Sequence, residues 1–155
     1  MRRSTKPVQS RHTDAGQAVV EFTLMVSTIV LLLLSVLDFM MVVYTYSVMA
    51  DSAKEGVRYA VAHGCDAGAA NCSGPGCTAA CTDAAGNNVV AAVNNYAKLC
   101  AHNISGMTVT VTYPDSYATP PNRVRVVINY PYPSFFTLGW KGPRINAAAE
   151  GRISY

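Results

Sequence analysis

Five cysteines between residues 65 and 100 are the side chains best suited to chemistry in this 155-residue chain: Cys65, Cys72, Cys77, Cys81 and Cys100. No two of them form a C-x2-C pair, and the histidines form no H-x3-5-H pair, so the spacing argues against a structural zinc site. We therefore expect neither a metal nor another cofactor. All five cysteines follow a long apolar segment and none precedes it, which indicates disulfides on the oxidised side of a membrane.

The sequence does not choose among the possible disulfide pairings, and an odd number of cysteines leaves at least one unpaired in a monomer. A Cys/His nucleophile could pair Cys65 with His63, or Cys100 with His102, but neither pair has a third group nearby to orient it. Walker, G-x-S-x-G, H-E-x-x-H and dinucleotide motifs are all missing from the sequence. We expect a protein that is not an enzyme.

Two acids interrupt an otherwise uncharged apolar stretch: Glu21 and Asp38 are the only charged residues between Ala18 and Ala50. Roughly 20 residues of helix cross a bilayer, so we predict a span at about residues 19–39. A carboxylate in hydrocarbon costs about 2.5–3.5 kcal/mol, and Glu21 therefore needs a partner. Asp38 lies near the far interface, where it is either a polar contact between packed helices or an acid at the headgroup level.

The charges around this span predict its orientation. Residues 1–16 are polar and basic, whereas the far flank is balanced between acids and bases. Positive charge favours the cytoplasmic side, so we expect a cytoplasmic leader at residues 1–16, a single span and an exported C-terminal part. The net charge of +3 is spread along the chain, which argues against a nucleic-acid partner.

The head of the apolar run carries a recognisable motif, Gly16-Gln17-Ala18-Val19-Val20-Glu21-Phe22. It resembles the processing site of a type IV prepilin. The resemblance implies that a prepilin peptidase cuts after Gly16, which makes Gln17 the first mature residue and Glu21 the fifth. Glu21 would then pair with the α-amine of a neighbouring subunit. The alternative is a boundary glycine followed by an acid that interacts with the helix dipole.

Further motifs extend the resemblance over about residues 15–64. Asp38-Phe39, Tyr44 and the run Ala53-Lys54-Glu55-Gly56-Val57-Arg58-Tyr59-Ala60 resemble the TadE-like minor pilins of the Tad/Flp (type IVb) pilus. This implies a structural subunit of the bacterial inner membrane that takes part in assembling a pilus for adhesion or secretion. Its partners would be other Tad/Flp pilins, the pilus assembly platform and the prepilin peptidase. Glu55, Gly56 and Arg58 would form a subunit contact, with a solvated helix face as the alternative for the charges.

The pattern of residues predicts an α+β protein. A long helix over residues 17–63 would measure on the order of 70 Å. A small extracytoplasmic domain over residues 64–155 would follow, beginning with an irregular glycine- and cysteine-rich loop. The loop would cover residues 64–88, and a helix would follow at residues 88–101. We predict two strands at residues 107–113 and 123–130, and a third near the C-terminus at residues 145–155.

Two functions fit these features, and a third, a hydrolase or redox protein that uses a free cysteine, is disfavoured by the missing catalytic neighbours. The first is a minor pilin or pseudopilin-like subunit of a Tad/Flp pilus. The second is a membrane-anchored extracytoplasmic binding module that does not enter a filament. Cleavage after Gly16 distinguishes the first from the second.

Overall fold

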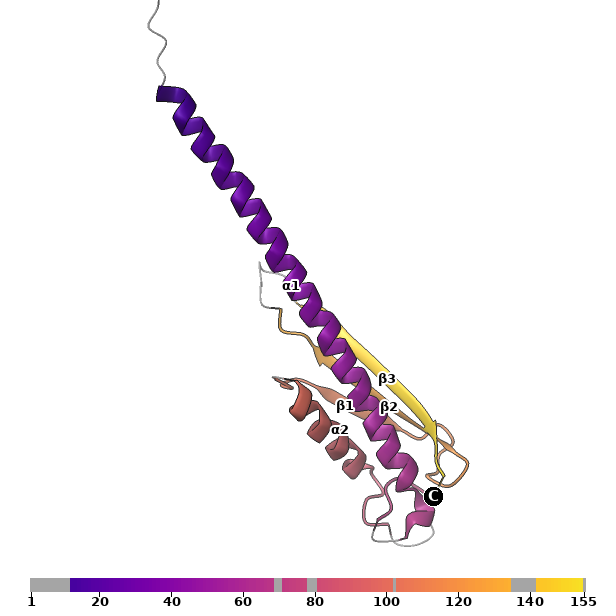
Figure 1. Ribbon diagram of the computed structural model, residues 1–155. Helices are drawn as coiled ribbons and strands as arrows, with labels where there is room; N and C mark the ends of the chain where they lie inside the picture. Colours follow the sequence, from indigo (N-terminus) through magenta and orange to yellow (C-terminus); the bar gives the residue numbers. More distant parts are fainter. Residues whose placement is uncertain (1–11, 69–70, 78–80, 102, 135–141, 155) are drawn as a thin grey trace, which may run out of the picture. The chain divides into compact units, whose positions relative to one another are not determined.

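The computed structural model describes residues 12–68, 71–77, 81–101, 103–134 and 142–154 (Figure 1). Its elements follow the order α1 (His12–Ala62), the short 3-10 helix η1 (Cys65–Ala67), α2 (Asn87–Cys100), β1 (Thr108–Thr112), β2 (Arg123–Pro131) and β3 (Arg144–Arg152). The predicted α+β class, with a long helix, a short helix and an antiparallel sheet, is confirmed.

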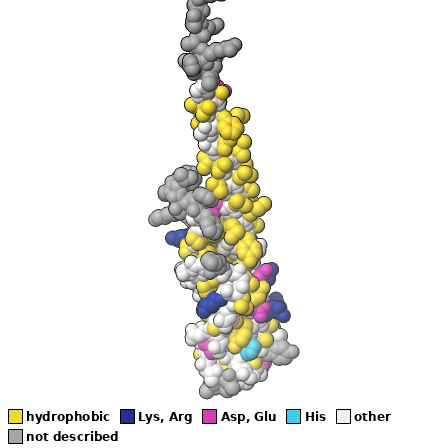
Figure 2. Space-filling view, turned by 60° about the vertical axis from the view of Figure 1, so that its left-hand side comes forward, with side chains coloured by type: hydrophobic (Ala, Val, Ile, Leu, Met, Phe, Trp, Pro, Cys, Tyr) yellow, Lys and Arg dark blue, Asp and Glu magenta, His cyan; other side chains and the backbone are white. Residues whose placement is uncertain are grey.

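The chain divides into two compact units, Met1–Phe39 and Met40–Tyr155. In the described part of the first unit, the side chains from Gly16 to Leu33 are exposed although most of them are apolar (Figure 2). A helix that is apolar on all sides needs an apolar surrounding. By length and composition, Gly16–Ala62 is a helix able to cross a membrane, in agreement with the predicted span.

Hydroxyl groups within the apolar stretch are satisfied by the helix itself. Four of them donate to the carbonyl four residues earlier at 2.7–2.9 Å: Thr23, Ser27, Thr28 and Ser35. In hydrocarbon an unsatisfied polar group costs several kcal/mol. These hydroxyls therefore add little to the cost of inserting the helix.

The boundaries of α1 differ from the prediction. The helix begins at His12 rather than Gln17 and ends at Ala62 rather than His63. Gly16 consequently lies inside the helix, because the residues between His12 and Gly16 contain no proline to stop it. Residues 1–11 of the predicted leader lie outside the described part of the chain.

The second unit is larger than the predicted small domain, because the C-terminal part of α1 belongs to its core. Met49, Ala53, Val57 and Ala60 are buried at helical spacing along one side of α1. They join one cluster with buried residues of α2 and of the sheet: Val89, Val93, Val124, Val126, Ile128, Tyr130, Ile145 and Ala147. Without this part of α1, the sheet would lose part of the cover that α1 and α2 provide together.

The sheet has the order β1-β2-β3, with both pairs antiparallel. In β2 the buried side chains alternate with exposed or partly exposed ones, as the period of two predicted. The register pairs Thr110 with Val127, and Val127 with Ala148. Figure 1 shows β3 lying alongside the C-terminal part of α1. The predicted helix at 88–101 and strands at 107–113, 123–130 and 145–155 each differ from the observed elements by only one to three residues at an end.

Candidate functional site

Glu21 lies on the exposed, apolar part of α1. Its Oε1 accepts a hydrogen bond from Gln17 Nε2 at 3.0 Å, one turn earlier. The predicted first and fifth mature residues are therefore in contact within one chain. This bond engages one of the two carboxylate oxygens of Glu21.

Asp38 is half-exposed near the end of the first unit. The predicted span at 19–39 ends one residue later. Both predicted roles, an acid at the headgroup level and a contact with another helix, fit this position.

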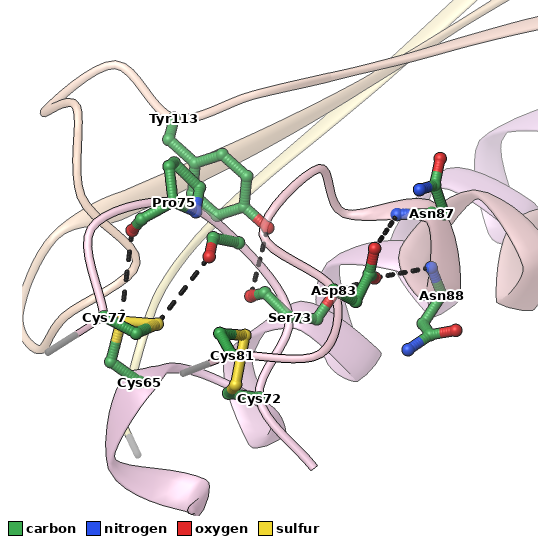
Figure 3. Close-up of a disulfide and its surroundings, with 11 residues drawn as sticks. Cys65, Cys72, Ser73, Pro75, Cys77, Cys81, Asp83, Asn87, Asn88 and Tyr113 are labelled. Carbon is green, nitrogen blue, oxygen red and sulfur yellow. Dashed lines mark hydrogen bonds between the residues drawn. A yellow bond between two sulfur atoms is a disulfide. The ribbon is translucent and has the colours of Figure 1, made fainter. Parts of the chain in front are cut away.

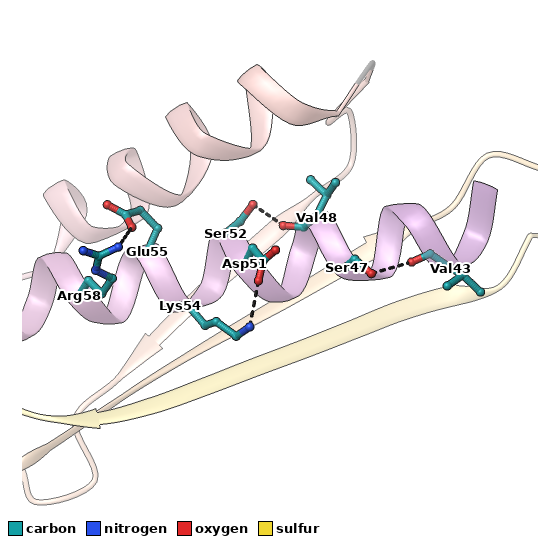
Figure 4. A network of polar contacts seen from close by, with 8 residues as sticks. All are labelled: Val43, Ser47, Val48, Asp51, Ser52, Lys54, Glu55 and Arg58. Carbon is teal, nitrogen blue, oxygen red and sulfur yellow. Dashed lines mark hydrogen bonds and ion pairs between the residues drawn. The ribbon is translucent and has the colours of Figure 1, made fainter. Parts of the chain in front are cut away.

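Glu55, Gly56 and Arg58 come from the part of α1 that packs in the small domain. Glu55 and Arg58 form an ion pair at 3.4 Å, with side chains 40% and 80% exposed. Figure 4 shows a second pair one turn earlier, in which Lys54 Nζ contacts Asp51 Oδ1 at 2.9 Å. Exposed pairs of this kind contribute little to stability, so the side chains remain available to a partner.

Gly56 is buried against its own chain rather than exposed toward another subunit. A Cβ at this position would collide with a methyl group of Val93 in α2 and touch Val126 in β2. The predicted close approach at this glycine is thus made within the chain. Of the three predicted contact residues, only Glu55 and Arg58 are on the surface.

The cysteine-rich loop contains two disulfides, Cys65–Cys77 and Cys72–Cys81 (Figure 3). Cys100, at the end of α2, is a free thiol. The two bridges interleave along the chain. The sulfurs of Cys72, Cys77 and Cys81 lie within 4.8 Å of one another because the bridges are adjacent. Sulfurs committed to disulfides are not thiolate ligands, so this proximity does not make a zinc site.

The two Cys/His pairs considered from the sequence have different outcomes. Cys65 is in a disulfide, so it offers no thiolate beside His63. The His63 ring stacks on Tyr59, with 4.0 Å between ring centroids. His102 lies outside the described residues, so the pair with Cys100 is not placed.

Asp83 connects this loop to α2, and sequence reasoning missed it. Its carboxylate accepts 2.7 Å hydrogen bonds from the Ser73 hydroxyl and from the backbone N–H groups of Asn87 and Asn88 (Figure 3). Gly86, the residue before α2, has no side chain to cap the helix, and its φ of +73° suits glycine. Asp83 therefore caps the free N–H groups of α2 from three residues upstream of Gly86. In the sequence, the only indication of this capping role is that Asp83 precedes the predicted start of the helix.

The electrostatics of the loop follow from this arrangement. Burial alone would raise the pKa of Asp83, but hydrogen bonds from Asn88, Ser73 and Asn87 together lower the pKa below its usual value. Burial, with a smaller contribution from the charge of Asp83, raises the pKa of Tyr113 to about 12. The Tyr113 hydroxyl donates to the Ser73 carbonyl at 3.3 Å. The loop is thus tied to both α2 and the sheet.

Cys100 lines an apolar groove of about 610 Å³ within the second unit. The groove lies between α1, the end of α2 and the end of β2, and its walls include Met41, Val48 and Tyr132. The Tyr44 hydroxyl donates to the Cys100 carbonyl at 3.1 Å. The fifth cysteine thus lies outside the loop that contains the two disulfides, and Tyr44 of α1 helps to position its backbone.

Comparison with known families gives one result that bears on these residues. The family described as TadE, TadE-like protein, matches residues 16–58. Neither the comparison with curated proteins nor that with solved structures gave a match. The matched stretch starts at Gly16, includes Glu21 and Asp38, and ends at Arg58. Residues 16–58 of this chain therefore match the TadE-like family, and the motifs of the same stretch predicted this resemblance.

Proposed function

We propose that this chain is a minor pilin or pseudopilin-like structural subunit of a Tad/Flp pilus, with no catalytic activity. The observation that carries the proposal is the TadE-like match at residues 16–58, which begins at the predicted cleavage glycine and contains the acid five residues later. The same stretch forms a helix apolar enough to cross a membrane. The association of residues 16–58 with pilus function comes from their resemblance to the TadE-like family.

In this proposal α1 anchors the subunit in the bacterial inner membrane, with the N-terminus in the cytoplasm and the small domain outside. Prepilin peptidase removes the leader after Gly16 and frees the α-amine of Gln17. The amine of an adjacent pilin then pairs with Glu21, which offsets the cost of placing the carboxylate in hydrocarbon. The assembly platform moves the recruited subunit into a pilus that serves adhesion or export.

Sequencing the N-terminus of the mature protein, purified from membranes, tests this proposal. We expect the protein to begin at Gln17 in cells with prepilin peptidase and at its original N-terminus in a strain lacking the peptidase. The mature protein should also co-purify with other Tad/Flp pilins.

An intact leader in peptidase-positive cells, together with no co-purifying pilin, would contradict the proposal. That result would favour a membrane-anchored binding module outside any filament.

A further inference from the structure

The apolar groove that contains Cys100 lies where the chain enters the second unit. Its α1 wall is formed by Met41, Tyr44, Thr45 and Val48, and every described residue that lines it belongs to the second unit. None of these lining residues is charged. An uncharged groove of about 610 Å³ suits an apolar ligand, such as the acyl chain of a lipid.

Exposed apolar side chains occur on both helices beside this groove. Leu99, the neighbour of Cys100 in the last turn of α2, is 85% exposed. On α1, the side chains of Met40, Val43 and Tyr46 are also exposed. Apolar side chains that gather around a groove indicate an interaction surface, whereas single ones scattered over a domain do not.

The chain itself limits how far from the membrane this groove can lie. Tyr44 follows Phe39, the end of the predicted span, by five residues of continuous helix, which rise about 8 Å. The headgroup region is roughly 5–8 Å deep on each side of the hydrocarbon. Any tilt of the helix only brings Tyr44 closer to the hydrocarbon. Because the Tyr44 hydroxyl donates to the Cys100 carbonyl, the end of α2 stays beside it.

A second cavity, of about 370 Å³, meets the groove at Tyr130, which lines both. Its lining is largely polar and includes Asn129, Arg144 and Asn146. The four ion pairs found among the described residues do not involve Arg144, and no acid lines this cavity. A guanidinium beside amide groups suits the phosphate of a headgroup.

We propose that this end of the second unit binds a phospholipid of the anchoring membrane, with an acyl chain in the groove and the phosphate at Arg144. The inference rests on the proposed membrane-anchored subunit. The ligand is amphiphilic because one cavity is apolar and uncharged, the other holds a guanidinium, and both adjoin Tyr130. The bilayer is the source because the groove lies within reach of its headgroups.

Photo-cross-linking in vesicles tests this lipid site. The full chain is reconstituted in phosphatidylethanolamine and phosphatidylglycerol with a trace of phosphatidylglycerol that carries a diazirine in one acyl chain. After irradiation, mass spectrometry maps the lipid adducts. We expect adducts at Cys100 or Tyr132, in addition to those on the predicted span that any membrane-crossing helix would give.

Two matched variants of α1 test the groove. The Thr45 and Ser47 hydroxyls each donate to the carbonyl four residues earlier, and the Ser47 bond is drawn in Figure 4. Only Thr45 lines the groove. Thr45→Trp should lower the adducts at Cys100 and Tyr132 about tenfold with little change in Tm, because the new side chain occupies the space that the acyl chain needs. Ser47→Trp should not lower them.

Two arginine variants test the phosphate contact. Arg144→Gln should lower the adducts in the groove about fivefold, because one basic residue near an anionic surface contributes roughly that factor to lipid attraction. Arg125→Gln is the matched control, since Arg125 is exposed on the same sheet and lines neither cavity. It should leave the adducts unchanged.

Adducts confined to the span, or groove adducts that persist in Thr45→Trp with an unchanged Tm, would overturn the lipid site. Groove adducts that increase when the protein is diluted in the vesicles would also overturn it, because a second copy would then be the occupant. Equal losses in Arg144→Gln and Arg125→Gln would overturn the phosphate contact. If the leader is nevertheless removed and other pilins co-purify, the lipid site fails while the proposed function stands.

Discussion

At the scale of single residues, Asp83 shows how one side chain holds together segments that the sequence leaves unconnected. It links Ser73 in the disulfide loop to the first turn of α2. We expect Asp83→Ala to lower the free energy of unfolding by about 1 kcal/mol, within the roughly 0.5–2 kcal/mol range for a lost helix cap. Urea unfolding of the oxidised protein measures this, with the exposed Asp66→Ala as the matched control.

The same residue predicts a pH dependence. The pKa of Asp83 is lower in the folded protein than its usual value near 3.8, so its contribution to stability is fully present above that value. The contribution is lost as the pH falls through the lower, folded pKa. The difference in unfolding free energy between the original protein and Asp83→Ala should therefore shrink below about pH 4; a difference that is constant down to pH 2 would contradict the capping role.

Glu21 is the residue that tests the assembly mechanism. Glu21→Gln should leave leader removal and membrane insertion intact, because a neutral amide costs less in hydrocarbon than a carboxylate. Pilus abundance and co-purification with other pilins should fall, because the α-amine of the neighbour loses its counter-charge.

A carboxylate that interacts only with the helix dipole is worth about 0.3–1 kcal/mol and predicts little change in assembly. Normal piliation of the Glu21→Gln strain, with leader removal verified, would support that simpler role. Gln17→Ala, which removes the side chain that donates to Glu21 within the chain but keeps the α-amine, is the matched control.

At the scale of elements, the contact between α1 and α2 depends on Gly56. A methyl group at this position would meet the buried side chain of Val93, and overpacking a core typically costs about 1–3 kcal/mol. We expect Gly56→Ala to destabilise the small domain by that amount, as measured by thermal or urea unfolding.

A double-mutant cycle checks the cause. Val93→Ala removes the methyl groups that the new side chain would strike, so the double variant should be more stable than the sum of the two single changes predicts. Simple additivity would show that Gly56 is not packed against Val93 in solution.

The disulfide loop carries the second prediction at this scale. Peptide mapping without reduction should find Cys65 linked to Cys77, Cys72 linked to Cys81 and a free thiol at Cys100. Each bridge closes a short loop and should contribute roughly 2–3 kcal/mol. Cys100→Ser should leave both bridges and the Tm unchanged, whereas any linkage that includes Cys100 within a monomer would contradict the pairing.

At the scale of the whole molecule, the topology of the chain can be tested directly. With a peptide tag appended after Tyr155, protease added to intact spheroplasts should remove the tag from an N-in, C-out protein, since the basic leader favours the cytoplasm. A tag that is protected until the membrane is permeabilised would reverse the assignment. A cytoplasmic protein detected in the same sample controls for leakage.

The sequence by itself determined the features that depend on composition and short spacing. Apolar length predicts a helix able to cross a membrane, and periods of two predict the strands. The motif around Gly16 and Glu21 carries the family resemblance that the match at residues 16–58 confirms. Such properties are local, because each depends on neighbouring residues within one helix or strand.

Only the tertiary structure decided the features that depend on contacts between distant residues. It chose one disulfide pairing among many, and it placed Gly56 in the core of the small domain rather than on a subunit surface. It also showed Asp83 as the cap of α2 and β3 as an outer strand of the sheet. The physical reason is common to all four: burial, cross-linking and strand order arise from packing between segments far apart in the chain, which local spacing does not encode.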